Sequence, residues 1–260
     1  MKINVHFTNH HFDDMYFTGK TSVAIDVLRA TTVIVTALVN GAREVIPVNS
    51  VDFAMKISGN TFGGQTILGG ERNTKMIEGF TLGNSPLEYT PEIVAGKSVV
   101  LYTTNGSKAI VKAKFSEIQY ICCFNNLPAI ANHLCLLNKD VEINCAGTNG
   151  NFNMEDAICA GRLINEMMNF DNTIEISDEG KASLNLNKSF GKNILKMLRN
   201  SEHGKLLIEN GFADDLKICS GYGISNLIPY YVSGSIKKYD AEIVNNINNE
   251  TKISEDAEEK

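Results

Sequence analysis

Apolar segments of strand length and of helix length alternate along most of the chain. Residues 22–28 form an apolar run typical of a buried strand, and residues 31–42 continue at helical spacing until Asn40-Gly41 ends the pattern. The same order of strand, turn and helix returns in residues 97–113. Strands that alternate with helices predict an α/β fold, a layered, mostly parallel or mixed sheet with helices on both faces.

The other elements follow from the same spacing rules, and residues 72–91 stand out because they show little periodicity and several turn signals. The predicted strands lie in 44–49, 65–71, 117–124, 141–150 (with a turn), 217–222 and 227–239, and the predicted helices in 51–60, 127–138, 154–168 and twice within 185–211, where the second opens at Ser201. We expect one α/β domain over residues 1–244, either undivided or in two lobes. The polar residues 245–260 are expected to form a disordered tail.

Composition excludes some classes of function. The chain has 260 residues, 43% of them hydrophobic, and a net charge of −6 without a concentrated basic face, which argues against nucleic-acid binding. No signal-like start and no run of 18 apolar residues occurs, so we expect no membrane segment. The six cysteines form no C-x-x-C pair and have no histidines at zinc spacing, which indicates core thiols in a reducing compartment, the cytoplasm. The size suits a monomer or a twofold dimer.

Polar residues follow several of the predicted strands, where ligands gather in parallel sheets. The sequence Thr-Asn-Gly occurs there twice, as Thr104, Asn105 and Gly106 and again over residues 148–150, each time between an apolar strand and an apolar helix. Hydroxyl, amide and glycine backbone groups before a helix could hold an anion. The alternative is ordinary turn chemistry, because Asn-Gly is a common turn pair.

Four carboxylates lie at the same predicted edge. Asp26 ends an apolar strand, where an unpaired carboxylate would be costly to bury, so it needs Arg29 or a bound cation as its partner. Glu71 lies in a glycine-containing turn, and Glu155 and Asp156 occupy the first turn of a helix, where the helix dipole alone favours acids. Together they are the hard oxygen ligands that Mg²⁺ prefers.

The two arginines near these acids allow two interpretations. Arg29 and Arg72 either form structural ion pairs or grip a doubly anionic substrate with their forked guanidinium groups. Common phosphatase motifs are absent: no cysteine has an arginine six residues on, and neither D-x-D-x-[TV] nor G-x-S-x-G occurs.

Five sequence blocks in this order resemble the 2-phosphosulfolactate phosphatase family. They are IDVLRATTVIVTAL (25–38), ILGGERN (67–73), GFTLGNSPLEY (79–89), TTNGSKA (103–109) and CAGTNGNFNMEDAICAG (145–161). A fainter resemblance continues through residues 201–219 and 228–236. The match departs from the family in residues 219–231, which lack an acidic residue expected shortly before Pro229; if that acid selects the substrate, a different ester would be hydrolysed.

The resemblance implies a Mg²⁺-dependent phosphomonoesterase that converts 2-phosphosulfolactate to 3-sulfolactate and phosphate, a step of coenzyme M biosynthesis in methanogens. It implies an α/β fold that is not a common phosphatase superfold. The matching blocks carry over these residues as functional: Asp26, Arg29, Glu71, Arg72, Asn84, Ser85, Thr104, Asn105, Gly106, Thr148, Asn149, Gly150, Glu155 and Asp156.

The mechanism expected from these residues assigns a role to each group. Mg²⁺ would be held by Asp26 with Glu155 or Asp156, and Glu71 would orient or deprotonate the attacking water. The arginines would neutralise substrate charge, while the two Thr-Asn-Gly turns, with Asn84 and Ser85, would bind the substrate and its phosphoryl group. The alternatives are a phosphatase of the same fold acting on another small phosphorylated hydroxy acid, or an anion-binding protein without catalysis.

Overall fold

The computed structural model of the chain describes residues 1–8, 12–13, 15–60 and 65–239, so the predicted tail over residues 245–260 lies outside the described residues. The elements, in chain order, are β1 (Lys2–His6), β2 (Thr21–Ile25), α1 (Ala30–Val39), β3 (Glu44–Val48), α2 (Val51–Asn60), β4 (Thr66–Arg72), β5 (Lys75–Met76), the 3₁₀ helix η1 (Pro86–Glu88), α3 (Pro91–Val94), β6 (Ser98–Tyr102), α4 (Gly106–Lys112), β7 (Ile118–Cys122), α5 (Leu127–Leu137), β8 (Val141–Cys145), α6 (Met154–Phe170), β9 (Glu175–Ile176), α7 (Asp178–Phe190), α8 (Ile194–Asn200), α9 (Glu202–Glu209), α10 (Asp215–Cys219), β10 (Pro229–Val232) and β11 (Ser235–Lys238).

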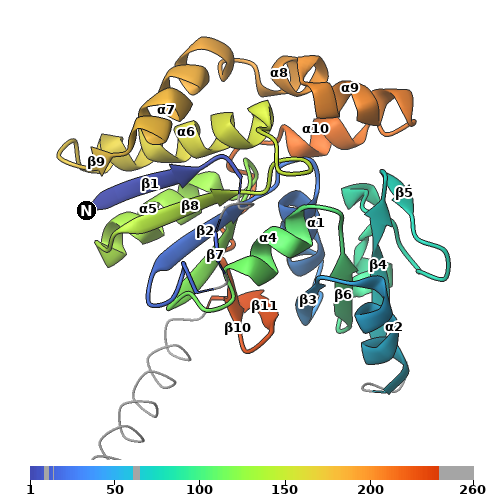
Figure 1. Ribbon diagram of the computed structural model, residues 1–260. Coiled ribbons are helices and arrows are strands. Elements are labelled where there is room, and N and C mark those ends of the chain that lie inside the picture. Colours follow the sequence, from blue (N-terminus) through green and yellow to red (C-terminus); the bar gives the residue numbers. More distant parts are fainter. Residues whose placement is uncertain (9–11, 14, 61–64, 240–260) are drawn as a thin grey trace, which may run out of the picture.

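One mixed sheet runs through the described part of the chain (Figure 1). Its strand order is β5-β4-β6-β3-β11-β10-β7-β2-β8-β1-β9. Strands β4, β6 and β3 are mutually parallel, and so are β7, β2, β8, β1 and β9. The hairpin β10–β11 joins these two parallel sets by antiparallel pairing to β7 on one side and to β3 on the other. The predicted α/β fold with a mixed sheet is confirmed.

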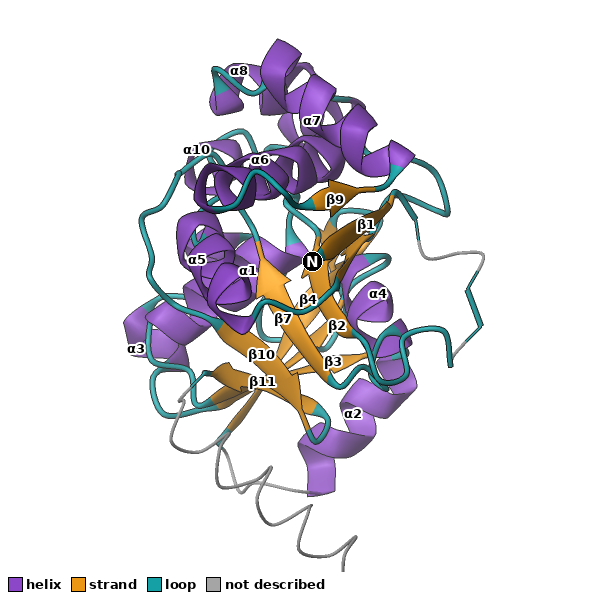
Figure 2. Ribbon diagram, turned by 90° about the vertical axis from the view of Figure 1, so that its left-hand side faces the viewer, coloured by secondary structure: helices purple, strands orange, loops and turns teal. Residues whose placement is uncertain are grey.

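Helices cover both faces of the sheet, as predicted. Helices α1 and α4 lie between the two parallel sets and share an apolar cluster with β3 and β6 (Figure 1). On the opposite face, α5 and α6 pack on β1, β2, β7 and β8 (Figure 2). Helix α2 packs on β3, β4 and β6. Because side chains alternate along a strand, Val23 and Ile25 of β2 belong to the α6 cluster and Ala24 between them faces α1.

The strand predicted over residues 217–222 is wrong, because this segment contributes to the short helix α10. Leu216 and Cys219 are both buried, and their spacing of three residues places them on one face of a helix. Such a short apolar run does not distinguish a strand from a buried helix by its pattern alone.

The helices before α10 are also more numerous than the two predicted within residues 185–211. Three helices pass through that range, α7, α8 and α9, and α7 begins earlier, at Asp178. The predicted opening at Ser201 is confirmed, since the Ser201 hydroxyl caps α9 by accepting a hydrogen bond from the Gly204 amide at 3.1 Å.

The cysteines of the chain are free thiols. Five of the six are buried and Cys135 is partly buried, in agreement with their interpretation as core residues. Among the described residues, no helix combines the length and the hydropathy that crossing a membrane requires.

Candidate active site

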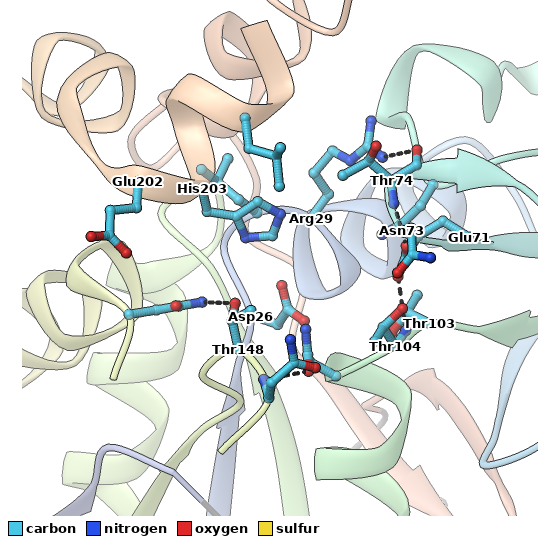
Figure 3. Close-up of a pocket in the computed structure, with 16 residues that line it drawn as sticks. Asp26, Arg29, Glu71, Asn73, Thr74, Thr103, Thr104, Thr148, Glu202 and His203 are labelled. Carbon is cyan, nitrogen blue, oxygen red and sulfur yellow. Dashed lines mark hydrogen bonds between the residues drawn. The ribbon is translucent and has the colours of Figure 1, made fainter. Parts of the chain in front are cut away.

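A pocket of about 250 Å³ lies where the carboxyl ends of β2, β4, β6 and β8 meet the first turns of α1 and α9 (Figure 3). The edge of the sheet selected from the sequence is therefore the edge that carries this pocket. The pocket is lined by Asp26, Leu28, Arg29, Glu71, Asn73, Thr74, Asn84, Thr103, Thr104, Asn105, Thr148, Asn149, Asn153, Glu202, His203 and Leu206.

A larger hollow of about 540 Å³ lies between β3, α2 and the β10–β11 hairpin. Its walls include apolar side chains such as Ile46, Val48 and Phe53, and two of its three charged lining residues, Glu44 and Lys237, face one another at 3.7 Å. The smaller pocket is the candidate active site because it gathers polar side chains from many segments and contains ionisable groups with strongly shifted pKa values.

Asp26 is the carboxylate at the floor of the pocket. It directly follows β2, and its Oδ1 accepts a hydrogen bond from the Ala30 amide at 3.3 Å, at the start of α1. Among the described residues, none donates a hydrogen bond to its Oδ2. Burial raises the pKa of Asp26 to about 7, and the charges of Glu71 and Glu155 act in the same direction. This carboxyl therefore has one oxygen available to a ligand.

Gly106 begins α4 directly beside Asp26. A Cβ at this position would overlap the Asp26 Oδ2 and the Ala30 Cβ. Glycine is the residue that allows α4 to approach the start of α1 this closely. The close contact with Asp26 thus explains why the first Thr-Asn-Gly sequence has a glycine at position 106.

The sequence had placed Glu71 in a glycine-containing turn, but the residue lies inside β4. Its Oε2 accepts a hydrogen bond from the Thr74 amide and its Oε1 one from the Thr104 amide, both at 2.8 Å. One carboxylate therefore connects the loop after β4 to the loop after β6. The preceding glycines leave room for other parts of the protein, since a Cβ at Gly69 or Gly70 would overlap Tyr89 or the Tyr102 backbone.

The two Thr-Asn-Gly turns are in contact with each other. The Asn105 Oδ1 accepts a hydrogen bond from the Asn149 amide at 3.1 Å. In the second turn, Asn149 and Gly150 both have positive φ angles, 51° and 79°, and Thr148 and Asn151 exchange two backbone hydrogen bonds. This is the conformation of a tight hairpin turn, which the Asn-Gly pair favours. The turns form one continuous wall of the pocket.

Four polar atoms of the pocket lining are buried without a hydrogen-bond partner among the described residues. They are the Thr74 Oγ1, the Asn84 Oδ1, the Thr104 Oγ1 and the His203 Nδ1. Buried polar groups in folded proteins are nearly always hydrogen-bonded, so unpaired ones in a pocket point to a partner supplied by a ligand or by water. The lining is therefore suited to a polar molecule.

Arg29 is buried and does not pair with Asp26. Its Nη1 lies 2.6 Å from the Oδ2 of Asp215 in α10, and its Nη2 donates to the Thr74 carbonyl oxygen at 3.2 Å. Ser85 does not line the pocket, and its hydroxyl donates to the other carboxylate oxygen of Asp215 at 2.6 Å. Arg29 is thus not bonded to Asp26, although its nearby positive charge still acts to lower the pKa of that carboxyl.

Glu155 and Asp156 lie behind the pocket wall. Asp156 accepts hydrogen bonds from the Val27 amide at 2.9 Å and the Gly147 amide at 3.3 Å, so it fixes the loops after β2 and β8. Burial, together with the charges of Asp26 and Glu155, raises the pKa of Asp156 well above its usual range. Burial also raises the pKa of Glu155. Three acids thus lie close together, without an arginine or lysine directly bonded to any of them among the described residues.

His203 was not identified from the sequence and lies across the pocket from Asp26 (Figure 3). Its Nδ1 is 3.7 Å from the Glu155 Oε1, and both atoms are buried without a hydrogen-bond partner among the described residues. Burial lowers the pKa of His203 to about 4, helped by the nearby charge of Arg29, so the ring is neutral near pH 7. The signals in the sequence were the helix start at Ser201 and the fainter family resemblance over residues 201–219, and neither singled out the histidine.

The structure brings together eight of the residues expected from the sequence at the pocket surface: Asp26, Arg29, Glu71, Asn84, Thr104, Asn105, Thr148 and Asn149. Five others support this wall from behind or beside it: Ser85, Gly106, Gly150, Glu155 and Asp156. Arg72 is exposed and is not among the described residues that line the pocket. Consecutive strand residues point to opposite faces, which explains why Glu71 faces the pocket and Arg72 does not.

Comparisons with known proteins agree on one family. Residues 7–234 match the family described as 2-phosphosulpholactate phosphatase. A protein of Symbiobacterium thermophilum named probable 2-phosphosulfolactate phosphatase is 39% identical over 218 residues, which cover 84% of this chain and 94% of that protein. Proteins with the same name from Caldanaerobacter subterraneus and Clostridium beijerinckii are 38% and 39% identical, over 91% of this chain and 98% and 99% of their own lengths.

Proposed function

This chain belongs to the 2-phosphosulfolactate phosphatase family, and we propose that it hydrolyses 2-phosphosulfolactate to 3-sulfolactate and phosphate in a reaction that depends on Mg²⁺. The observation that carries this proposal is the pocket at the strand ends, in which an arginine, backbone turns and unpaired polar atoms surround a carboxylate with a free oxygen. We further propose that the protein acts in the cytoplasm, which its six free thiols support.

The size and the chemistry of the pocket suit a small, highly anionic ester. Its volume of about 250 Å³ lies below the range of about 300–1,000 Å³ typical of sites for drug-sized ligands, as expected for a three-carbon substrate. The phosphate, carboxylate and sulfonate of the substrate together carry close to four negative charges at neutral pH. Arg29 supplies one positive charge, which Asp215 offsets, so a bound cation is needed to balance the substrate and the acids.

The residues present fit Mg²⁺. Asp26 offers a carboxylate oxygen without a hydrogen-bond partner among the described residues, and Glu71 and Glu155 are near enough for their charges to raise its pKa. Within the described residues, no group of three or more His, Cys, Asp or Glu side chains is arranged to hold a metal ion by itself. Mg²⁺ at phosphate sites characteristically uses one or two carboxylates and completes its shell with substrate oxygens and water. Asp26, with Glu155 or Asp156 behind it, would hold the ion, which when bound polarises the phosphoryl oxygens.

Side chains of the pocket bind the phosphoryl group and orient the attacking water. The N–H groups of Arg29 and the polar atoms of Thr104, Asn105 and Thr148 bind the oxygens of the phosphoryl group. Glu71 retains lone pairs beyond its two amide hydrogen bonds and orients the attacking water. The water oxygen bonds to phosphorus as the ester oxygen leaves and takes up a proton, which gives the hydroxy acid and inorganic phosphate.

A second candidate substrate is another small phosphorylated hydroxy acid such as 2-phospholactate. The segment that departs from the family, residues 219–231, contributes none of the described residues that line the pocket. A change of substrate through this segment would therefore have to act indirectly, for example through Asn125, whose backbone carbonyl oxygen accepts a hydrogen bond from the Ser225 amide at 3.0 Å.

Phosphate release from 2-phosphosulfolactate, measured beside 2-phospholactate with Mg²⁺ and then with EDTA, tests the proposal. We expect metal-dependent turnover that favours the sulfonated ester. Turnover of 2-phospholactate alone would show that it, and not 2-phosphosulfolactate, is the substrate. Turnover that EDTA leaves unchanged would contradict the role of Mg²⁺. Binding of sulfolactate by folded protein that hydrolyses neither ester would favour an anion-binding protein.

A further inference from the structure

Arg29 is held from several sides before any substrate binds. Its side chain is buried, and its guanidinium group lies 4.2 Å above the centre of the Phe212 ring. Of its five N–H donors, one is directed at the Asp215 carboxylate and one at the Thr74 carbonyl oxygen, which leaves others for an anion in the pocket that Arg29 lines. An arginine fixed in this way loses its side-chain freedom on folding and not on substrate binding.

We propose that Asp215 is a positioning residue for this reaction: through one carboxylate it fixes Arg29 at the pocket and joins it to Ser85. Its Oδ2 lies 2.6 Å from the Arg29 Nη1, and its Oδ1 accepts from the Ser85 hydroxyl at 2.6 Å. The inference rests on the proposed function, because it concerns how the substrate anion is gripped. Asp215 does not line the pocket, so it acts through Arg29.

The arrangement joins three distant parts of the chain. Arg29 lies at the start of α1, Ser85 precedes η1, and Asp215 is 186 positions beyond Arg29, at the start of α10. Both charged side chains are almost fully buried, at 1% and 2% exposure, so solvent screens the pair little. Removing the Asp215 carboxylate would take away the ion-pair partner of Arg29 and allow its guanidinium group to adopt other orientations. The affinity of the pocket for an anion would then fall.

A double-mutant cycle tests whether Asp215 acts through Arg29. We expect Asp215→Ala to lower kcat/KM by about 30-fold or more, mainly through a higher KM, and to weaken binding of inorganic phosphate in parallel. In the Arg29→Met background the same change should cost less than about 3-fold, because the group it positions is gone. Asp214→Ala is the matched control, since Asp214 is exposed and pairs with Lys217 at the surface.

Wild-type kcat/KM and phosphate affinity in folded Asp215→Ala would overturn the inference, and so would losses that multiply in the double variant. Urea unfolding of each protein separates an effect on stability from an effect on the folded enzyme. Should Asp215→Ala not fold, Asp215→Asn and Ser85→Ala provide the comparison, each with a smaller loss in the same direction. If the wild type binds phosphate and hydrolyses neither ester, the proposed function fails while the cycle in phosphate affinity still decides the inference. Wild type that neither hydrolyses an ester nor binds phosphate would overturn both.

Discussion

Gly106 and Asp26 are in contact at the centre of the site, although 80 positions of sequence separate the start of α4 from the end of β2. The contact exists because position 106 lacks a Cβ, which would overlap the Asp26 Oδ2. The carboxylate oxygen that we assign to the metal is thus placed by the packing of two helix starts against each other. Small changes in this packing should be visible in catalysis.

Gly106→Ala should therefore lower kcat/KM by about 100-fold, since displacement of a catalytic group by about 1 Å can have an effect of that size. The added methyl group has to push either Asp26 or Ala30 aside. Gly180→Ala in α7 is a suitable control, because its nearest neighbour would be the Ile176 Cβ at 3.3 Å, far from the pocket. Steady-state kinetics of both variants gives the comparison, and an active Gly106→Ala enzyme would contradict the proposed packing.

Thr104→Val should reduce activity without reducing stability. The Thr104 Oγ1 is buried without a partner among the described residues, so its loss removes no hydrogen bond of the folded protein. If the hydroxyl binds the phosphoryl group, kcat/KM should fall by about 10-fold.

Thr21→Val provides the control for this experiment. Thr21 also has a buried and unpaired Oγ1, but it lies at the opposite end of β2 from the pocket. We expect similar free energies of unfolding in urea for the two variants, whereas only Thr104→Val should lose activity. Destabilisation confined to Thr104→Val, with unchanged kcat/KM, would show that its hydroxyl has a structural role.

The pKa of Asp26 predicts how stability depends on pH. Its folded-state pKa of about 7 exceeds the ordinary aspartate value of about 4, so between these values the folded protein holds a proton that the unfolded chain has released. The free energy of unfolding should therefore fall as the pH rises from about 4 to about 7. Glu155 and Asp156 contribute in the same direction, so Asp26→Asn should weaken this dependence without abolishing it.

Mg²⁺ should act in the opposite sense, because a cation at Asp26 favours the charged carboxylate. The increase in Tm that Mg²⁺ produces should be larger at pH 8 than at pH 5.5, and much smaller in Asp26→Asn. Thermal unfolding with Mg²⁺ or with EDTA at the two pH values measures this. An equal shift in both proteins would place the ion elsewhere.

The sequence allowed prediction of those parts of the site that depend on local pattern. Asp26 lies near the end of an apolar run and the Thr-Asn-Gly turns follow two others, so the rule that ligands gather at strand ends was enough to locate them. Which way each side chain points is also local in a strand, but Glu71 was assigned to a turn, so the difference between Glu71 and Arg72 was not predicted.

The remaining parts depend on how short helices pack, which a single sequence does not specify. His203 and Asp215 reach the site from α9 and α10, helices of 8 and 5 residues whose orientation is set by tertiary contacts. Residues 217–219 of α10 were assigned to a strand, and Asp215, just before them, was not identified as the partner of Arg29. Likewise, Glu155 and Asp156 are adjacent in α6 and therefore point in different directions. Asp156 accepts a hydrogen bond from the Val27 amide, whereas Glu155 faces His203.

The most direct test of the central claim is the rate of phosphate release from 2-phosphosulfolactate by Asp26→Asn beside the wild-type protein, with saturating Mg²⁺. The side chains are of nearly equal size, so the variant should fold and still bind inorganic phosphate. We predict that kcat/KM falls by at least about 100-fold and that Mg²⁺ no longer increases the rate. Full activity with full dependence on Mg²⁺ in Asp26→Asn would show that this pocket does not hold the metal through Asp26.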